Sequence, residues 1–286
     1  MANQIHILAT VRNPALLDAA LLVFKSLRLG FPHNAVTVYG NGLRSDHAAA
    51  VQQAAASANA AFNWIRPTAH DVWLEHLVQS QDEPFWICDT DIVFFAPVKP
   101  PTAAGVDLAG RFEPGFDEEW TQCFHVERLH TCLLYLDPLA LRAKMRAWLH
   151  QHVPSIFSHA GCQFIRQHFV AVLERDCAGG QSQHGDIPGR DQAAAAGLAT
   201  QPRSTTHFYD TAAGLYHAFG GTAFDEEQNA AFEHLHCGSY SDLIGRCESL
   251  KDLPAVHQAV LANPDQARGL HAAQAQYYST RGVEHV

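Results

Sequence analysis

The chain has 286 residues, of which 47% are hydrophobic and 17% charged, and its formal net charge is -10. A chain of this length can bury a sizeable core, and it fits one large domain or one domain with an extension. No apolar run is long enough to span a bilayer, and the acidic balance argues against a broad nucleic-acid-binding surface.

The seven cysteines form no CxxC pair and are odd in number. This pattern is not that of a disulfide framework, and a reducing compartment is the simplest setting for it. No basic segment precedes the first apolar run, so a signal peptide is not expected. The sequence therefore predicts a cytoplasmic protein without stable membrane insertion, and it leaves the oligomeric state open.

The first third of the chain alternates between strand-like and helix-like segments. Strands are expected at 5–11, 35–39 and 61–65. Helices are expected after Asn13-Pro14, which suits a helix cap and first turn, at about 45–60, and from Thr68 or His70. Alternation at this spacing indicates a parallel sheet with right-handed crossovers.

The apolar run at 85–95 contains two carboxylates, Asp89 and Asp91, that are separated by Thr90. A short run that is apolar on both faces is typical of a buried parallel strand. The two carboxylates are then expected where this strand ends, at the edge of the sheet where open α/β folds bind ligands. Two close carboxylates are costly to desolvate, so a divalent cation that bridges to a phosphate is the expected partner.

The loops that follow the first two strands should open on the same edge. Thr10 and Arg12 follow the first strand, and Asn41 follows the second. A ligand of nucleotide size could be held between these loops and the carboxylates. The alternative for Arg12 is a solvated loop cation.

The second half departs from regular alternation. Strands are expected at 106–112, 129–136 and 207–209, with helices from Asp137-Pro138, at 158–175 and from Asp225. The acidic and aromatic stretch at 113–124 suggests a loop that faces a sugar or the solvent. Residues 177–204 are rich in glycine and poor in large apolar side chains, which indicates a lid or an inert loop. Two helical segments are expected in the tail, at 252–262 and 264–278.

The strand that ends in Asp89-Thr90-Asp91, after a βαβα half that begins at Ile5, resembles the DxD motif of the GT-A-fold glycosyltransferases. The resemblance covers about the first 140 residues well. It implies an α/β fold with a mostly parallel, Rossmann-like central sheet flanked by helices and a helical C-terminal extension. It also implies one catalytic domain over 1–286, with a nucleotide-sugar and metal half at 1–140, an acceptor side at 141–250 and a tail at 251–286.

The resemblance further implies roles for individual residues. In that family the motif holds Mn²⁺ or Mg²⁺ on the diphosphate of a nucleotide sugar, with UDP-sugars as the expected donors here. Asp91 is then the metal ligand, while Asp89, with Thr90, contacts the donor and can share the metal. A histidine near the C-terminal end often adds a ligand, and His236, which precedes Cys237-Gly238-Ser239, is similar to that element.

Other side chains are assigned from chemistry. His234 lies two residues before His236 and shares a face with it if this segment is extended. A developing diphosphate charge requires cations, for which Arg190 in the glycine-rich stretch is a candidate. An inverting enzyme also requires a carboxylate base, for which Asp225 and Glu227 are candidates. Acids at this place also suit a helix N-terminus.

The sequence leaves the acceptor and two other functions open. The acceptor hydroxyl could belong to a glycan, a protein, a lipid-linked glycan or modified nucleic acid. One alternative is a haloacid-dehalogenase-like phosphatase, although that family places threonine soon after its second aspartate, where this chain has Ile92-Val93-Phe94-Phe95. The other is a non-catalytic module that binds a nucleotide sugar or a carbohydrate.

Overall fold

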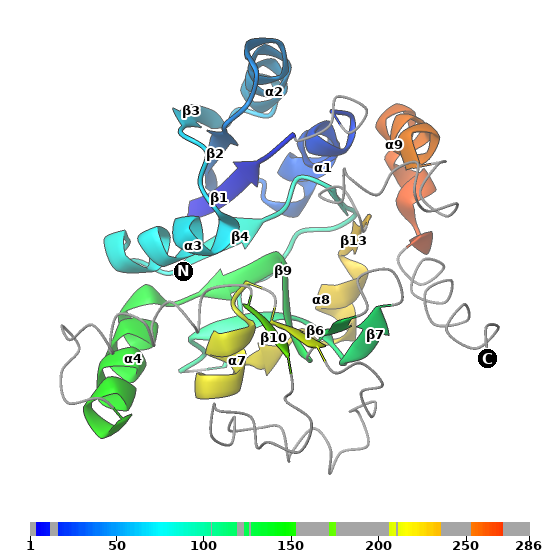
Figure 1. Cartoon of the computed structure of the whole chain (residues 1–286). Coiled ribbons are helices and arrows are strands. Elements are labelled where there is room, and N and C mark those ends of the chain that lie inside the picture. Colours follow the sequence, from blue (N-terminus) through cyan, green and yellow to red (C-terminus); the bar gives the residue numbers. More distant parts are fainter. Residues whose placement is uncertain are drawn as a thin grey trace. The chain divides into compact units, whose positions relative to one another are not determined.

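The computed structural model describes residues 4–11, 17–103, 105–118, 123–125, 127–152, 172–175, 206–209, 211–235 and 253–270. They belong to two compact units that interleave along the chain. The first unit comprises Met1–Thr68, Phe85–Pro100 and Asp225–Val283, and the second comprises Ala69–Pro84, Pro101–Phe224 and Glu284–Val286. Figure 1 shows the elements of both units, coloured along the sequence. The predicted division of one catalytic domain at residues 140 and 250 stays a prediction.

Four parallel strands form the sheet of the first unit, in the order β4-β1-β2-β3. They are β1 (Gln4–Ala9), β2 (Ala35–Asn41), β3 (Ala61–Ile65) and β4 (Phe85–Cys88). Gln4 of β1 is opposite both Ala35 and Phe85, so β1, β2 and β4 begin at the same level of the sheet. The predicted α/β fold with a mostly parallel sheet is confirmed, and the carboxyl ends of these strands meet at one edge.

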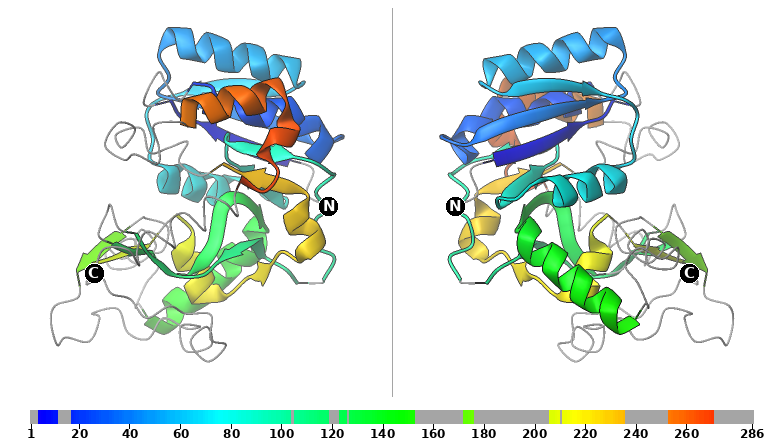
Figure 2. Two further views of the ribbon diagram at one scale, coloured as in Figure 1. Left: turned by 90° about the vertical axis from the view of Figure 1, so that its right-hand side faces the viewer. Right: turned by 90° about the vertical axis from the view of Figure 1, so that its left-hand side faces the viewer.

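Helices flank this sheet, and they come from both ends of the chain. They are η2 (Ala19–Leu21), α1 (Leu22–Gly30), α2 (Ser45–Ser57), α8 (Glu226–Ala230), α9 (Leu253–Ala262) and η4 (Pro264–Ala267). The helix α2 packs on β2 and β3, and α9 packs on α1 and η2. Both side views in Figure 2 show α9, in orange, beside the blue helix α1.

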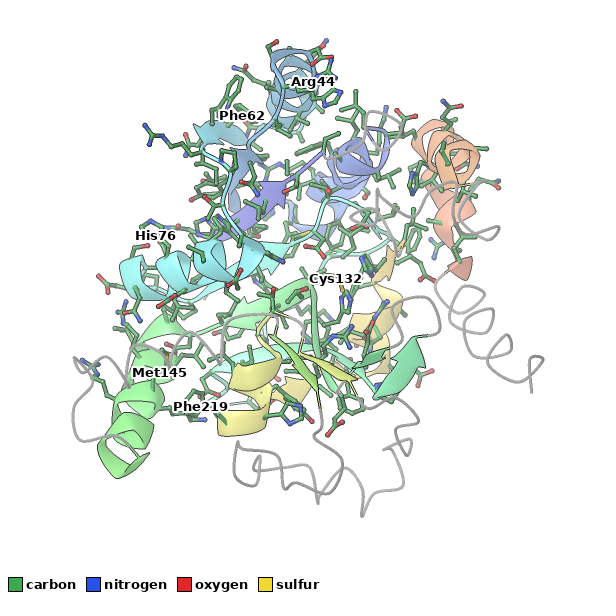
Figure 3. All side chains as sticks on the ribbon, in the orientation of Figure 1. Arg44, Phe62, His76, Cys132, Met145 and Phe219 are labelled. Carbon is green, nitrogen blue, oxygen red and sulfur yellow. The ribbon has the colours of Figure 1, made fainter. Side chains whose placement is uncertain are left out.

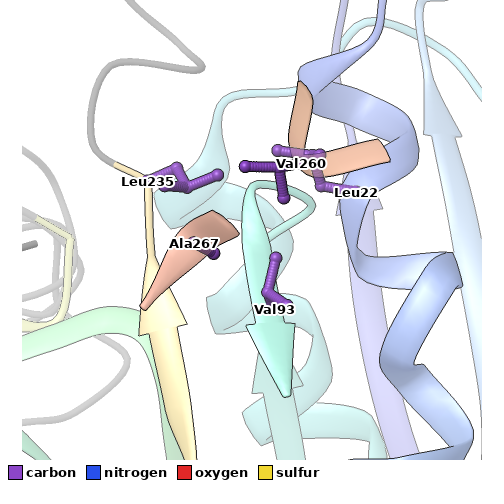
Figure 4. Packing of buried hydrophobic residues seen from close by; sticks show 5 residues of the cluster. All are labelled: Leu22, Val93, Leu235, Val260 and Ala267. Carbon is purple, nitrogen blue, oxygen red and sulfur yellow. The ribbon is translucent and has the colours of Figure 1, made fainter. Parts of the chain in front are cut away.

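The predicted helical tail is confirmed in the described residues, and it belongs to the core of the first unit. Val260 of α9 and Ala267 of η4 are buried in one apolar cluster with Leu22, Val93 and Leu235 (Figure 4). Because this cluster joins three distant segments of the chain, the tail stabilises the unit through burial of apolar surface.

The apolar run at 85–95 forms two strands, where the sequence suggested one. After β4, the chain turns at Asp89-Thr90-Asp91 and continues as β5 (Ile92–Phe94), which pairs with β13 (Phe232–His234) in an antiparallel ladder. The ring of Phe94 lies directly over Gly30, where a Cβ atom would come within 2.5 Å of it. A glycine at the end of α1 therefore lets β5 pack closely against that helix.

The second unit contains three described helices and two sets of hydrogen-bonded strands, which run in the orders β12-β6-β9 and β10-β11-β8-β7. The strands are β6 (Leu108–Glu113), β7 (Phe116–Glu118), β8 (Cys123–His125), β9 (Arg128–Leu136), β10 (Val172–Arg175), β11 (Thr206–Tyr209) and β12 (Thr222–Ala223). The helices are α3 (His70–Ser80), α4 (Pro138–His152) and α7 (Ala213–Phe219). Figure 3 marks α3 by His76 and α4 by Met145.

Two expectations for the second unit are wrong in part. The stretch at 113–124 is not a plain loop, because Phe116–Glu118 pairs with Cys123–His125 as antiparallel strands. Residues 172–175, expected at the end of a helix, form a strand that pairs with β11. The rest of that helix, the glycine-rich stretch at 177–204, and the tail beyond residue 270 lie outside the described residues.

No helix in the described part of the chain combines the length and the apolar character that a membrane span requires.

Candidate functional site

The loop after β4 holds the predicted DxD residues at the carboxyl edge of the first unit's sheet. The strand ends at Cys88, and the main chain then presents Asp89, Thr90 and Asp91 before β5 begins. The backbone N–H of Val23, in the first turn of α1, donates to the Thr90 carbonyl oxygen at 2.9 Å. The loop is therefore fixed from one side by the helix that follows β1.

The strand β13 fixes the loop from the other side and brings a histidine to it. In the antiparallel register with β5, His234 is opposite Ile92. The backbone N–H of Leu235 donates to the Asp91 carbonyl oxygen at 2.8 Å, which extends the pairing by one residue. As a result, the Nε2 atom of His234 lies 3.3 Å from the Oδ1 atom of Asp91.

Asp91 is buried and still favours its charged form. Only 5% of its surface is exposed, and so is 5% of that of His234. Burial raises the pKa of Asp91, but the charge and hydrogen bond of a protonated His234 and a backbone N–H lower it, and the net pKa lies below its ordinary value. A cation at His234 thus stabilises the Asp91 carboxylate, and a metal ion could take the place of that proton.

Three side chains form a donor set that fits a divalent metal. One donor atom from each of Asp89, Asp91 and His234 can be chosen so that all three lie within 4.8 Å of one another. Carboxylate oxygens suit Mg²⁺ and Mn²⁺, whereas an imidazole nitrogen favours transition metals. The mixed set therefore fits Mn²⁺ better than Mg²⁺, and Asp89, which is half-buried, leaves the set accessible from one side.

Two of the predicted donor-contact residues are brought together at the same edge of the sheet. The side-chain amide of Asn41 donates to the Thr10 hydroxyl at 3.1 Å and to the Thr68 carbonyl oxygen at 2.9 Å. The Asn41 carbonyl oxygen accepts from the backbone N–H of Thr68 at 2.8 Å. Because the Asn41 side chain makes these three bonds, it acts first as a clamp that orders the loops around Thr10 and Thr68.

The two predicted bases make structural contacts. Asp225 caps α8: its Oδ1 atom accepts from the backbone N–H of Gln228 at 2.8 Å, and the Gln228 side chain bonds back to the Asp225 N–H. Glu227 pairs with Lys99 at 2.6 Å on the surface, where both side chains are more than two-thirds exposed. These contacts match the helix N-terminus considered from the sequence, and the catalytic assignment stays a prediction.

Three other predicted site residues, Arg12, Arg190 and His236, lie outside the described residues. The histidine that the structure places at the DxD loop is His234. The sequence signal for it was its place on the same extended face as His236. Its pairing with Asp91 depends on the β5–β13 register, which no local pattern reveals.

Substitutions at Asp225 separate its capping role from a catalytic role. Asp225→Ala removes the cap and is expected to lower the free energy of unfolding by about 1 kcal/mol. Asp225→Asn keeps an equally good cap and should leave that free energy nearly unchanged. If Asp225 is the base, both variants lose activity; if it is only a cap, Asp225→Asn remains fully active. Urea unfolding and a transfer assay on the same preparations measure the two effects.

Comparisons with known proteins identify distant structural likenesses only. No family model matches the sequence, and no curated protein matches it. The solved structures that resemble the chain include the WbbM bifunctional glycosyltransferase, with 10% identity over 50% of this chain and 32% of that chain and a TM-score of 0.34. The chain thus spans about a third of the length of WbbM.

Two further solved structures are matched over more of their own length. One is the galactosyltransferase LgtC in complex with donor and acceptor sugar analogs, with 14% identity over 79% of this chain and 99% of that chain and a TM-score of 0.35. The other is a Bacillus anthracis protein proposed to be a glucose-1-phosphate thymidylyltransferase, in complex with sucrose, with 8% identity over 57% and 94% of the two chains and a TM-score of 0.33. At TM-scores of this size we draw no functional conclusion from these likenesses.

Proposed function

We propose that this protein is a metal-dependent glycosyltransferase that moves a sugar from a nucleotide-diphosphate sugar to an acceptor hydroxyl. The observation that carries the proposal is the meeting of Asp89, Asp91 and His234 at the carboxyl edge of a parallel sheet. This edge is where open α/β sheets bind ligands. Two carboxylates and one imidazole there form a site for a metal that also binds phosphate oxygens.

Each residue of the site has a separate task in this proposal. Asp91 and His234 hold the ion, and Asp89 shares it or contacts the donor. Thr10, positioned by Asn41, lies on the neighbouring strand end and is available to the nucleotide. When bound, the divalent ion would supply positive charge that neutralises the nucleoside diphosphate as the glycosyl–phosphate bond of the donor breaks.

The finer assignments rest on the sequence resemblance and on donor chemistry. The donor is a UDP-sugar, and the ion is Mn²⁺, with Mg²⁺ as the second choice because of the imidazole ligand. The acceptor is a hydroxyl of a glycan, a protein, a lipid-linked glycan or modified nucleic acid. Arg12, Arg190 and His236 remain predicted donor and metal contacts, and Asp225 or Glu227 remains the predicted base of an inverting reaction.

One structural observation favours a non-catalytic binding protein as the second candidate. Both predicted bases are held by other partners, Asp225 as a helix cap and Glu227 in an ion pair with Lys99. A protein with the metal site that lacks the catalytic groups for transfer would bind the donor without releasing a nucleoside diphosphate. The phosphatase alternative has less support, because an apolar strand, β5, follows Asp91 directly in place of the expected threonine.

A thermal-shift panel of nucleotide sugars, with and without Mn²⁺, tests the proposal. Binding to the folded state raises the melting temperature, and a donor at 100 times its dissociation constant adds about 2.7 kcal/mol of stability. We expect a shift with one donor class that requires Mn²⁺. Nucleoside diphosphate release in the presence of acceptors separates the transferase from the binding protein, and the absence of a shift with every donor would contradict both. Hydrolysis of a simple phosphate ester without a nucleotide would favour the phosphatase.

A further inference from the structure

His257 is a buried imidazole whose ring nitrogens lack partners within the described part of the chain. It lies on α9, its side chain is completely inaccessible to solvent, and neither Nδ1 nor Nε2 has a hydrogen-bond partner there. Burying a polar group without a hydrogen bond is costly, so such a group in a folded protein calls for an explanation. An apolar side chain would serve packing better at this position.

The surroundings of His257 connect it to the DxD loop. Val260 is one helical turn further along the same face of α9, and it packs in the apolar cluster with Val93 and Leu235 (Figure 4). Val93 follows Asp91 by two residues, and Leu235 directly follows His234 and donates its N–H to the Asp91 carbonyl oxygen. Val260, on the same face of α9 as His257, thus packs against side chains that flank Asp91 and His234 in the sequence.

Electrostatics agree with this placement. Burial lowers the pKa of His257, while the charges of Asp91 and Asp18 raise it by a smaller amount, so the imidazole is neutral at pH 7. A neutral imidazole has one N–H to donate and one nitrogen that accepts. The charged neighbours of His257 are carboxylates, which only accept hydrogen bonds. The N–H is therefore the group of His257 that can bond to them.

The contact between Asp91 and His234 indicates which group the His257 N–H can serve. Nε2 of His234 faces Oδ1 of Asp91 at 3.3 Å. If both atoms bound a metal ion, the Asp91 carboxylate would no longer accept a hydrogen bond from His234. Metal-ligating carboxylates are generally held by other hydrogen-bond donors, and such donors are worth about 10- to 100-fold in metal affinity.

We propose that His257 is a positioning residue of the metal site, which donates its N–H toward the Asp91 carboxylate once His234 turns to the ion. This inference rests on the metal site of the proposed function. His257 is not itself a ligand here: among the described residues, it belongs to none of the groups of donor atoms that lie within 4.8 Å of one another. Where the distance between the His257 N–H and the Asp91 carboxylate exceeds hydrogen-bond length, a water molecule can bridge the two groups.

The test measures Mn²⁺ affinity without any nucleotide sugar, by calorimetry or by electron paramagnetic resonance, beside thermal melting of the metal-free protein. His257→Leu is expected to weaken Mn²⁺ binding about 10- to 100-fold. The same variant should melt no lower than the wild type without metal, because an apolar side chain replaces a buried imidazole that lacks partners. His257→Gln keeps an N–H donor and should bind Mn²⁺ within about tenfold of the wild type and clearly more tightly than His257→Leu.

His47→Leu is the matched control. His47 lies on α2, is 4% exposed and has an unpartnered Nδ1 atom, and its Nε2 atom is 3.9 Å from Asp46. This control should leave Mn²⁺ affinity unchanged. Equal affinity of His257→Leu and wild type would overturn the inference while leaving the proposed function intact, as would a loss in His257→Gln as large as in His257→Leu. A wild type that binds no Mn²⁺ would overturn the metal site itself. If His257→Leu does not fold, His257→Phe replaces it, with the same expected result and the same contradicting one.

Discussion

Asp91→Asn is expected to weaken Mn²⁺ binding at least about 100-fold, since outer partners of metal ligands alone are worth 10- to 100-fold. The substitution removes the charge of a buried ligand that lies 3.3 Å from His234, and it preserves the size of the side chain. We expect the transfer rate to fall by about 1000-fold, because a metal ion supplies several kcal/mol of charge stabilisation in the transition state. Calorimetric Mn²⁺ titration and a nucleoside diphosphate release assay measure the two losses.

Asp46→Asn serves as the control for this experiment. Asp46 is exposed on α2 and pairs with Arg44 at 3.2 Å, so its charge contributes little to stability and nothing to the site. This variant should bind Mn²⁺ as the wild type does. If Asp91→Asn also retained full Mn²⁺ affinity and a cooperative melting transition, the metal would have to bind elsewhere. The proposed role of the DxD loop would then be wrong.

The part of the fold that the sequence predicted well is the part governed by local patterns. The four parallel strands are short apolar or β-branched runs between helical segments, so periodicity and length suffice to find them. The position of Asp89 and Asp91 followed from the end of the run Phe85–Cys88. The closeness of Thr10 and Asn41 followed from parallel pairing alone, which places successive strand ends at one edge.

The part that the sequence did not reveal depends on pairing between distant segments. Nothing local in Phe232–His234 shows that it pairs with Ile92–Phe94, and this register decides that His234 lies beside Asp91. The proposed role of His257 is also not visible in the local sequence, because a histidine between Val256 and Gln258 matches an ordinary core residue of an apolar helix. The strand at Val172–Arg175 was assigned to a helix because short apolar runs suit either structure until a partner strand selects one.

Acidification is expected to destabilise the first unit through His6, and this loss begins above the pH at which carboxylates are protonated. His6 lies in the middle of β1, is 2% exposed and packs edge-on against the ring of Phe85. Burial lowers its pKa from 6.5 to about 4. Between these two values the unfolded chain binds more protons than the folded one, so the free energy of unfolding falls as the pH falls. The expected loss from this residue is about 2 kcal/mol by pH 5 and about 3 kcal/mol by pH 4.

His6→Gln isolates this contribution, because glutamine does not titrate and can still bond to the Tyr39 hydroxyl, which lies 3.2 Å from Nδ1 of His6. Urea unfolding at pH 7, 6, 5 and 4 should show a shallower loss of stability in His6→Gln than in the wild type, whatever the variant costs at pH 7. Tyr39→Phe removes the same hydrogen bond but leaves the imidazole buried, so it should keep the steep pH dependence of the wild-type unfolding free energy.

Because His257 also has a lowered pKa, His257→Leu should likewise make the unfolding free energy depend less steeply on pH. Parallel curves for His6→Gln and wild type would show that His6 keeps an ordinary pKa in the folded protein, and the buried placement of this imidazole on β1 would then be wrong.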